Sequence, residues 1–124
     1  MADQVVFSRC PFFQETFADK ARADSNVKDK MAAFIKSKTE NPMGPFGSSD
    51  KPYVGGGIFS KYVPGLKHAH LTHNISIMYT LSGSNPKLIK LYGLVNHDES
   101  GTGNPPNMNR QKSLGKKLTN QTFS

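Results

Sequence analysis

The sequence is poor in cysteine and has no long apolar run. Each absence limits the cellular compartments in which the protein is expected. Cys10 is the only cysteine in 124 residues, so no disulfide can form within the chain. A lone cysteine is typical of proteins in reducing compartments. The first residues have no charged start followed by an apolar stretch, unlike a secretory signal peptide. No window approaches the ~18 apolar residues of a transmembrane helix. These features predict a cytoplasmic location.

Acidic residues are also scarce, and the chain is strongly basic. Nine Asp and Glu stand against 16 Lys and Arg, which gives a net charge of +7 and a pI of about 9.6. Such a pI is typical of nucleic-acid-binding domains, although a well-solvated basic surface has the same composition. Thirteen of the cations are lysines, which bind phosphate as point charges. We expect RNA as the partner, bound by Lys61, Lys67, Arg110, Lys112, Lys116 and Lys117.

The hydrophobic fraction is modest, at 35%, and glycine and proline punctuate the chain. A chain of this length fits a single domain with one core. The 19 glycines and prolines concentrate in three stretches that we predict to be loops, at 41–57, 82–86 and 101–106. The three glycines at 55–57 could cradle a phosphate, but no P-loop sequence follows them. We therefore interpret them as flexible backbone.

A short strand and two helices are predicted in the N-terminal third. Residues 4–8 have the β-branched and aromatic character of a strand. In 12–23, apolar residues recur every four positions, which indicates one buried face of a helix. A second helix follows and ends at Asn41-Pro42, because the residue before a proline disfavours the helical region. Its apolar stripe consists of Val27, Met31, Phe34 and Ile35.

Further along the chain, the periodicity becomes that of strands. We predict strands at 58–63, 66–71, 75–81 and 87–95. The last is almost continuously apolar, so we expect it to be buried on both faces and central in the sheet. The element order predicts an α+β fold, in which an N-terminal helical hairpin packs on a small, mostly antiparallel twisted sheet.

The C-terminal segment differs from the rest in composition. From residue 101 onward it holds four cations, no acidic residue and few apolar residues. Such a composition does not favour a packed core of its own. We therefore expect one domain at 1–103, followed by a basic tail at 104–124 that is mobile or weakly helical.

All four histidines fall in and around the predicted strands, at His68, His70, His73 and His97. The simplest interpretation is a set of surface histidines on a basic protein. The H-x-H-x-x-H spacing is also similar to the metal-ligand motif of metallo-β-lactamase-type hydrolases, and three imidazoles could bind zinc. Those hydrolases are much longer, and this chain has Thr72 where their motif has an aspartate. We therefore expect neither a metal nor another cofactor.

Metal-independent cleavage of RNA is a third interpretation of the histidines. That reaction needs a base for the 2′-hydroxyl proton, an acid for the leaving 5′-oxygen, and cations that stabilise the charged phosphorane. Histidine suits both proton transfers because its pKa lies near neutrality. A sheet that brings His70 and His97 onto one face, beside Lys67 or Lys61, would supply all three parts.

Two short sequences carry a resemblance to a known family. They are HLTHNISIMY at 70–79 and GLVNHDESG at 93–101, and they follow a helical pair that ends in Asn-Pro. With these motifs, residues 5 to about 101 resemble the RelE/ParE toxin superfamily, and within it the YafQ-like branch of mRNA interferases. The resemblance implies a RelE-like endoribonuclease toxin that cleaves mRNA on the ribosome and is neutralised by an acidic antitoxin protein.

The resemblance also implies which residues carry the reaction. It places His70 and His97 on catalytic histidines, as general base and general acid. Asn74 stands where the family has an aspartate, and it can form hydrogen bonds but cannot accept a proton. His73 or Asp98 is then the side chain expected to compensate.

Two non-catalytic functions compete with this interpretation. In a ParE-like role, the same fold would poison DNA gyrase without chemistry, and such a protein has no need of His70 and His97. A basic RNA-binding protein would need only the fold and the cationic tail. Degradation of RNA by purified protein in EDTA separates the catalytic function from both.

Overall fold

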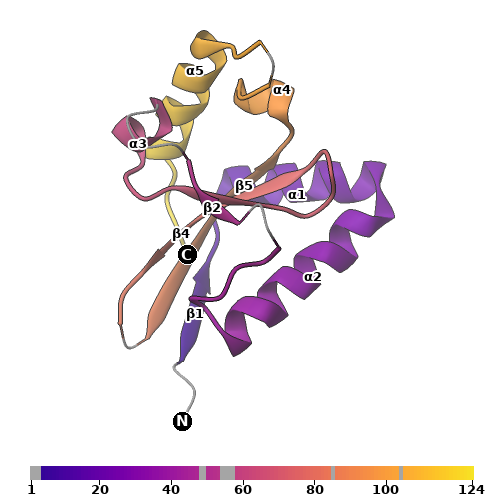
Figure 1. The fold of residues 1–124 in the computed structure, drawn as a ribbon, viewed down its shortest axis with the longest axis vertical. Coiled ribbons are helices and arrows are strands. Elements are labelled where there is room, and N and C mark those ends of the chain that lie inside the picture. The colour runs from indigo at the N-terminus through magenta and orange to yellow at the C-terminus, as the bar shows by residue number, and fades with distance from the viewer. Residues whose placement is uncertain (1–3, 48–49, 54–57, 85, 104) are drawn as a thin grey trace.

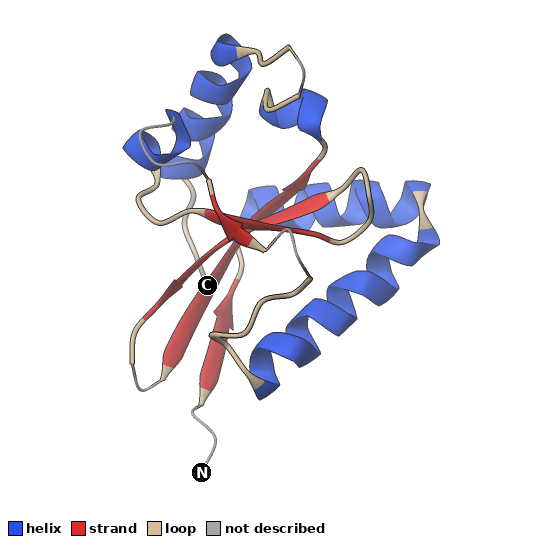
Figure 2. Cartoon of the chain, in the orientation of Figure 1, coloured by secondary structure: helices blue, strands red, loops and turns tan. Residues whose placement is uncertain are grey.

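In the computed structural model, the described residues are 4–47, 50–53, 58–84, 86–103 and 105–124. They contain the strands β1 (Val5–Ser8), β2 (Lys51–Pro52), β3 (Lys67–His70), β4 (Ser76–Ser82) and β5 (Lys87–Val95). They also contain the helices α1 (Pro11–Ala23), α2 (Ser25–Glu40), α3 (Ile58–Tyr62), α4 (His97–Ser100) and α5 (Met108–Thr119). Figure 1 shows their arrangement, and Figure 2 separates helices from strands by colour. Among these residues, no helix combines the length and apolar character needed to cross a membrane.

The described strands form one mixed sheet in the order β1-β5-β4-β3-β2. β5 pairs in parallel with β1, and the other neighbours are antiparallel. The α+β class is therefore confirmed, and β5 lies inside the sheet with its last five residues buried, as its apolar sequence predicts. A register shift between Met78 and Tyr79 interrupts the β4–β5 ladder. The glycines at 55–57 lie outside the described residues.

The N-terminal helices pack on one face of the sheet. Asp24 lies between them and caps α2, because its carboxylate accepts a hydrogen bond from the Asn26 N–H at 2.9 Å. Figure 1 shows α1 and α2 diverging from this junction, so a hairpin with two parallel-lying helices is not confirmed. The predicted apolar stripe of α2 does pack on the sheet. This first core contains Phe13, Val27, Met31 and Phe34 from the helices and Ile77, Tyr79, Ile89 and Leu91 from the strands.

Helices α3 and α5 cover the opposite face, and α3 corrects a prediction. Residues 58–63 were expected to form a strand, but Ile58–Tyr62 is helical. The reason is tertiary: Phe59 and Val63 lie one helical turn apart, and both are buried. They pack in a second core with Leu66, Met78, Tyr92, Val95, Leu114 and Leu118.

Residues 104–124 were expected to be a mobile or weakly helical tail, and Met108–Thr119 form the helix α5. Leu114 and Leu118 are 8% and 1% exposed, so one face of this basic helix is buried in the second core. Gly115 lets α5 approach α3 closely, since a Cβ there would lie 2.5 Å from the Tyr62 ring. Beyond α5, the Ser124 and Arg9 backbones exchange two hydrogen bonds, of 2.9 and 3.0 Å. The segment is thus folded against the domain, although its surface is cationic.

A buried ion pair holds the chain between α2 and β2. The Lys38 ammonium donates to the Asp50 carboxylate at 2.6 Å, and both side chains have no exposed surface. Asp50 also accepts hydrogen bonds from the Phe46 N–H, at 2.7 Å, and from the Tyr79 hydroxyl. The same ammonium donates to the Gly44 carbonyl at 2.6 Å. These contacts fix Asp50, and with it the start of β2, against the sheet.

Candidate functional site

His68 and His70 lie on the face of the sheet that α3 and α5 cover. In the β3–β4 ladder His68 pairs with Met78, and His70 pairs with Ser76. Paired residues of neighbouring strands project to the same face, and Met78 belongs to the second core. The alternate residues Lys67 and Ala69 therefore point to the α1–α2 face. The alternation of side chains along β3 therefore puts His68 and His70, and not Lys67, on the face where they can contact residues at the end of β5.

His97 lies where β5 turns into α4. Asn96 caps this short helix: its side chain accepts from the Glu99 N–H at 2.7 Å, while the Glu99 carboxylate accepts from the Asn96 N–H at 3.0 Å. Because Val95 pairs with Ser76, the first residue of α4 lies beside the end of β3. The His70 and His97 ring centroids are 5.7 Å apart, edge to face at 86°.

Four rings follow one another along this edge of the sheet. The Tyr53 and His68 centroids are 4.3 Å apart, and those of His68 and His70 are 6.4 Å apart. His70 and His97 complete the row. Two of the residues placed on catalytic positions by family resemblance are thus neighbours in space, and His68 lies beside them.

A cavity of about 320 Å³ adjoins the ring row. Its walls combine aromatic and apolar side chains with neutral hydrogen-bonding groups, one lysine and two histidines. Its lining consists of Lys51, Pro52, Tyr53, His68, Ser76, Val95, Asn96, His97, Ser100 and Thr102. A cleft with these walls can take a polar, partly flat group, with a negative charge near Lys51 and His97.

The histidines of β3 are held toward their neutral forms. Burial lowers the pKa of His70, and positive charge on His97 and Lys51 lowers it further. Burial also lowers the pKa of His68, again with help from His70 and Lys51. A neutral imidazole can accept a proton, so the environment favours His70 as a base near neutral pH.

The structure places the other predicted residues of the β3–β4 turn differently. His73 and Asn74 are both exposed. The backbone N–H of Asn74 donates to the Thr72 hydroxyl at 3.3 Å within the turn. Neither side chain lines the cavity. The ring contact brings His70 and His97 together, and of these two His97 lines the cavity, whereas His73 and Asn74 lie in the neighbouring turn.

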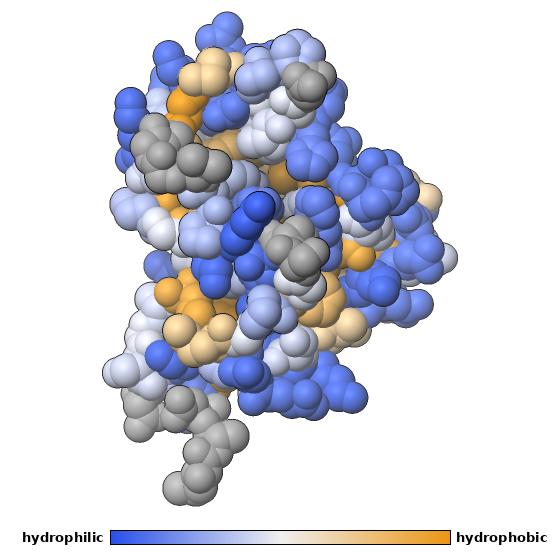
Figure 3. Space-filling view, viewed as in Figure 1, coloured by the Kyte–Doolittle hydropathy of each residue, from blue (hydrophilic) through white to orange (hydrophobic). Residues whose placement is uncertain are grey.

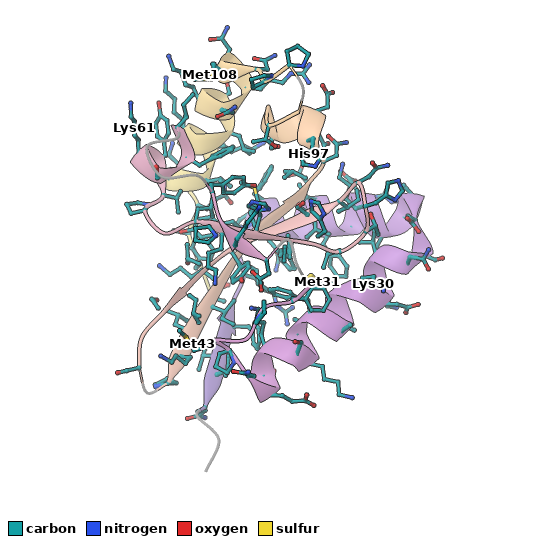
Figure 4. The ribbon with its side chains drawn as sticks, in the orientation of Figure 1. Lys30, Met31, Met43, Lys61, His97 and Met108 are labelled. Atoms are coloured by element: carbon teal, nitrogen blue, oxygen red, sulfur yellow. The ribbon has the colours of Figure 1, made fainter. Side chains whose placement is uncertain are left out.

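The predicted RNA-binding cations divide between two faces. The Lys67 ammonium lies 5.5 Å from the Tyr79 ring centroid, on the α1–α2 face, so it does not join the histidines. Lys61 is exposed on α3, and α5 carries Arg110, Lys112, Lys116 and Lys117, all exposed. Figure 4 shows Lys61, Met108 and His97 in the upper part of the view, and Lys30 and Met43 in the lower part. The α3–α5 cations thus share one end of the molecule with His97.

Two of the α5 cations also make contacts inside the molecule. Arg110 pairs with the Asp98 carboxylate at 2.9 Å and donates to the Asp98 carbonyl at 3.0 Å. The Lys117 ammonium lies 4.8 Å from the Phe12 ring centroid. The face seen in Figure 3 is mostly hydrophilic, with hydrophobic side chains in small separate patches. Such a surface suits a polar or charged partner better than an extended apolar one.

Sequence reasoning missed Lys51, Tyr53, Ser100 and Thr102. Lys51 lies in a two-residue strand inside the Gly- and Pro-rich stretch, where no periodicity can appear. It reaches the site because it pairs with His68 across β2 and β3. A signal for Thr102 was present: Asn96 and Glu99 have capping-box spacing, and Gly101 is a typical helix terminator.

The possible zinc motif does not form a metal centre in the described part of the chain. No group of three His, Cys, Asp or Glu side chains there has an arrangement that could hold a metal ion. His73, the third residue of the H-x-H-x-x-H run, lies exposed in the turn after β3.

Comparison with known proteins identifies the fold. The solved structure of a YoeB/ParE toxin from Agrobacterium tumefaciens is similar to this chain, with a TM-score of 0.57 and 17% sequence identity. The match covers 76% of this chain and 98% of that chain, so this chain has additional residues with no counterpart in that toxin. No family model and no curated protein matches the sequence. The chain thus has a toxin-type fold of the YoeB/ParE kind.

Proposed function

We propose that this chain is a RelE-like toxin of the YafQ-like branch, a metal-independent endoribonuclease that cleaves mRNA. The observation that carries the proposal is the His70–His97 pair, with ring centroids 5.7 Å apart, beside a cavity that His97 and Lys51 line. The fold similarity to a YoeB/ParE toxin supports the toxin class. The proposed substrate, the proposed reaction and the proposed family branch rest on the arrangement of the site residues.

The reaction is a transfer within the RNA strand. His70, as a neutral imidazole, removes the proton of the 2′-hydroxyl, and the 2′-oxygen forms a bond to the adjacent phosphorus. The bond from phosphorus to the 5′-oxygen breaks as His97, entering as an imidazolium, gives its proton to that oxygen. The products are a 2′,3′-cyclic phosphate and a 5′-hydroxyl. Each proton lost by one group is gained by another, so no cofactor is required.

Lys51 supplies the positive charge that the transition state needs. The phosphorane carries more negative charge than the phosphate, so a nearby ammonium stabilises it preferentially. Lys51 is exposed, and it acts on both His68 and His70 strongly enough to lower their pKa values. In this role it replaces Lys67, which the strand geometry directs to the other face.

The cations of α3 and α5 are the proposed contacts to the rest of the RNA. Helix α5 has no acidic residue, and Lys61 of α3 lies at the same end of the molecule (Figure 4). Such contacts are salt-sensitive and largely independent of sequence. The resemblance to mRNA interferases implies that this RNA is mRNA bound on the ribosome. An acidic antitoxin would neutralise the same cationic surface, and His73 and Asn74 would contact the strand from the exposed turn.

Cleavage of RNA by the purified protein in EDTA tests the proposal, first with mRNA alone and then with mRNA on ribosomes. Wild type should cut RNA and leave DNA intact, because DNA has no 2′-hydroxyl. His70→Ala and His97→Ala should each lower the rate by about two to four orders of magnitude, the usual effect of one proton-transfer group. Lys30→Ala, on α2 away from the histidines, is the matched surface control (Figure 4). A His97→Ala protein that cuts as fast as wild type would refute the assignment.

A second candidate function follows from the name of the similar toxin, which includes ParE. A ParE-like protein would inhibit DNA gyrase without chemistry. Under that function, His97→Ala and wild type would inhibit DNA supercoiling by gyrase to the same extent, and neither protein would cut RNA. The two assays, run on the same pair of proteins, decide between the functions.

A further inference from the structure

Residues after α4 fold back onto His97. Gly101 has a φ of 76°, the left-handed conformation that favours glycine, and it ends the helix. The next residue, Thr102, donates its backbone N–H to the His97 carbonyl at 3.0 Å. Its side-chain Oγ1 lies 3.3 Å from His97 Nδ1. The turn thus holds the Thr102 hydroxyl within hydrogen-bond distance of His97 Nδ1.

Ser100 extends this contact into a closed set of hydrogen bonds. It is only 2% exposed, and its Oγ lies 2.7 Å from Thr102 Oγ1. The same Oγ donates to the His97 carbonyl at 3.3 Å. Both hydroxyls also line the cavity beside the histidines, so they belong to the site and not to a remote part of the surface.

When all three side-chain contacts form hydrogen bonds at once, counting protons gives each bond a single direction. A carbonyl oxygen can only accept, so Ser100 must use its single hydroxyl proton on the His97 carbonyl. Thr102 must then donate its own proton to Ser100. With that proton committed, Thr102 Oγ1 can only accept from His97, which requires a proton on Nδ1. The chain of donors runs from His97 Nδ1 to Thr102, to Ser100 and back to the His97 carbonyl.

We propose that Ser100 and Thr102 are positioning residues that hold His97 in its Nδ1–H tautomer and leave Nε2 as the nitrogen that exchanges the catalytic proton. The tautomer is a property of the folded chain, and its use in catalysis rests on the function proposed above. In a histidine, the hydrogen bond made by one ring nitrogen determines which nitrogen carries the proton. Here two hydroxyls, neither of which can become charged at neutral pH, make that choice.

The fixed tautomer matters at the moment of proton transfer. As an imidazolium, His97 carries protons on both nitrogens and gives the one on Nε2 to the leaving 5′-oxygen. The neutral ring that remains already has the Nδ1–H form that Thr102 accepts, so the hydrogen bonds need not rearrange. Preorganisation of this kind lowers the barrier without adding charge to the site.

Nitrogen-15 NMR of the histidine side chains measures the tautomer without any substrate. Spectra are recorded at alkaline pH, where the imidazoles are neutral, and His97 is identified by its absence in His97→Ala. We expect wild-type His97 to be in the Nδ1–H form and Thr102→Ser to retain it. Thr102→Val, which keeps the shape but removes the hydroxyl, should shift the ring toward the Nε2–H form. Ser100→Ala frees the Thr102 proton and should give a mixture of the two.

The matched control is Thr39→Val, which removes a threonine hydroxyl that bonds only to the Ile35 carbonyl of α2, at 2.7 Å. It should leave the His97 spectrum unchanged. An Nε2–H form in wild type, or an identical His97 tautomer in wild type and Thr102→Val, would overturn the proposal. A cleavage assay then tests whether catalysis uses this tautomer. Thr102→Val should lower kcat by about tenfold, the effect of one lost hydrogen bond, and leave KM unchanged. Thr102→Ser should have the kcat of the wild type. A wild type that cuts no RNA would refute the endoribonuclease and leave the tautomer assignment standing.

Discussion

Replacing Asp50 by Asn should destabilise the protein far more than the same change on the surface. The Asp50 and Lys38 side chains have no exposed surface, and their charged atoms are 2.6 Å apart. Asn keeps the shape of the side chain and can still accept from the Phe46 N–H and donate to the Tyr79 hydroxyl. What the substitution removes is the charge, so the Lys38 ammonium is left buried and uncompensated.

Loss of one partner from a buried ion pair costs about 3–5 kcal/mol. The chain offers a matched control in Asp19, whose carboxylate pairs with Arg22 at 2.9 Å while both side chains are largely exposed. Asp19→Asn should cost less than about 1 kcal/mol, because solvent screens such pairs. Urea unfolding followed by circular dichroism measures both. If the two variants unfold at the same urea concentration, the buried pair does not stabilise this fold.

The pH dependence of unfolding gives an independent check on the same pair. Burial alone would raise the pKa of the Asp50 carboxyl, but hydrogen bonds from Lys38, Tyr79 and the Phe46 N–H outweigh it and hold the pKa below its ordinary value of 3.8. A depressed pKa in the folded state adds stability above the unfolded pKa, and that stability is lost as pH falls through the folded value. The gap between wild type and Asp50→Asn should therefore narrow only in acid. A gap that is the same at pH 2 and pH 7 would contradict this assignment.

Two further predictions concern the site and the C-terminal helix. Because burial and the charges of His97 and Lys51 lower the pKa of His70, the cleavage rate should rise with pH through a pKa below the ordinary 6.5, measured in a pH–rate profile. An acid limb at or above 6.5 would count against His70 as the base. Leu118→Ala, at a residue 1% exposed, should cost about 2–5 kcal/mol in urea unfolding, whereas Met108→Ala, at a residue 54% exposed, should cost less than about 0.5 kcal/mol. Equal effects would mean that α5 does not depend on its buried face.

The elements that sequence periodicity predicted well are those with a long, uninterrupted pattern. Helix α2 repeats its apolar residues from Val27 to Ile35, and Val27 and Phe34 are fully buried as that repeat requires. Strand β5 was predicted at the residues where it occurs, because nine residues of nearly continuous apolar character fit a strand covered on both faces. In both cases the local sequence and the tertiary packing favour the same structure.

The errors occurred where two patterns fit the same residues. Residues 58–63 alternate well enough for a strand, yet Phe59 and Val63 also have helical spacing, and packing on the sheet favours the helix. In α5, the pair Leu114 and Leu118 gave the same helical signal, but the surrounding lysines and Gly115 obscured it. Short segments with few apolar residues are decided by what they pack against, and the sequence alone does not contain that information.

Only the part of the site that follows from the alternation of side chains along a strand could be predicted from the sequence pattern. Alternation places His68 and His70 on one face, and the family resemblance pairs His70 with His97. The contribution of Lys51 could not be predicted, because its position depends on a two-residue edge strand after a loop. The hydroxyls of Ser100 and Thr102 depend in the same way on how a four-residue helix ends. Groups that act through a turn or an edge become visible only when the backbone is in place.

Asp50 and Lys51 connect the stability of the fold to the proposed chemistry. Adjacent residues of an extended chain project to opposite sides, so the Asp50 carboxylate enters the first core while Lys51 lines the cavity on the other side. The buried pair with Lys38 thus holds the one lysine of the site whose ammonium the proposed transition state needs. A substitution at Asp50 would then weaken both folding and cleavage, although the carboxylate touches no substrate. We expect Asp50→Asn to lower activity by displacing Lys51, because the Asp50 carboxylate contacts Lys38 and Tyr79 and does not line the cavity.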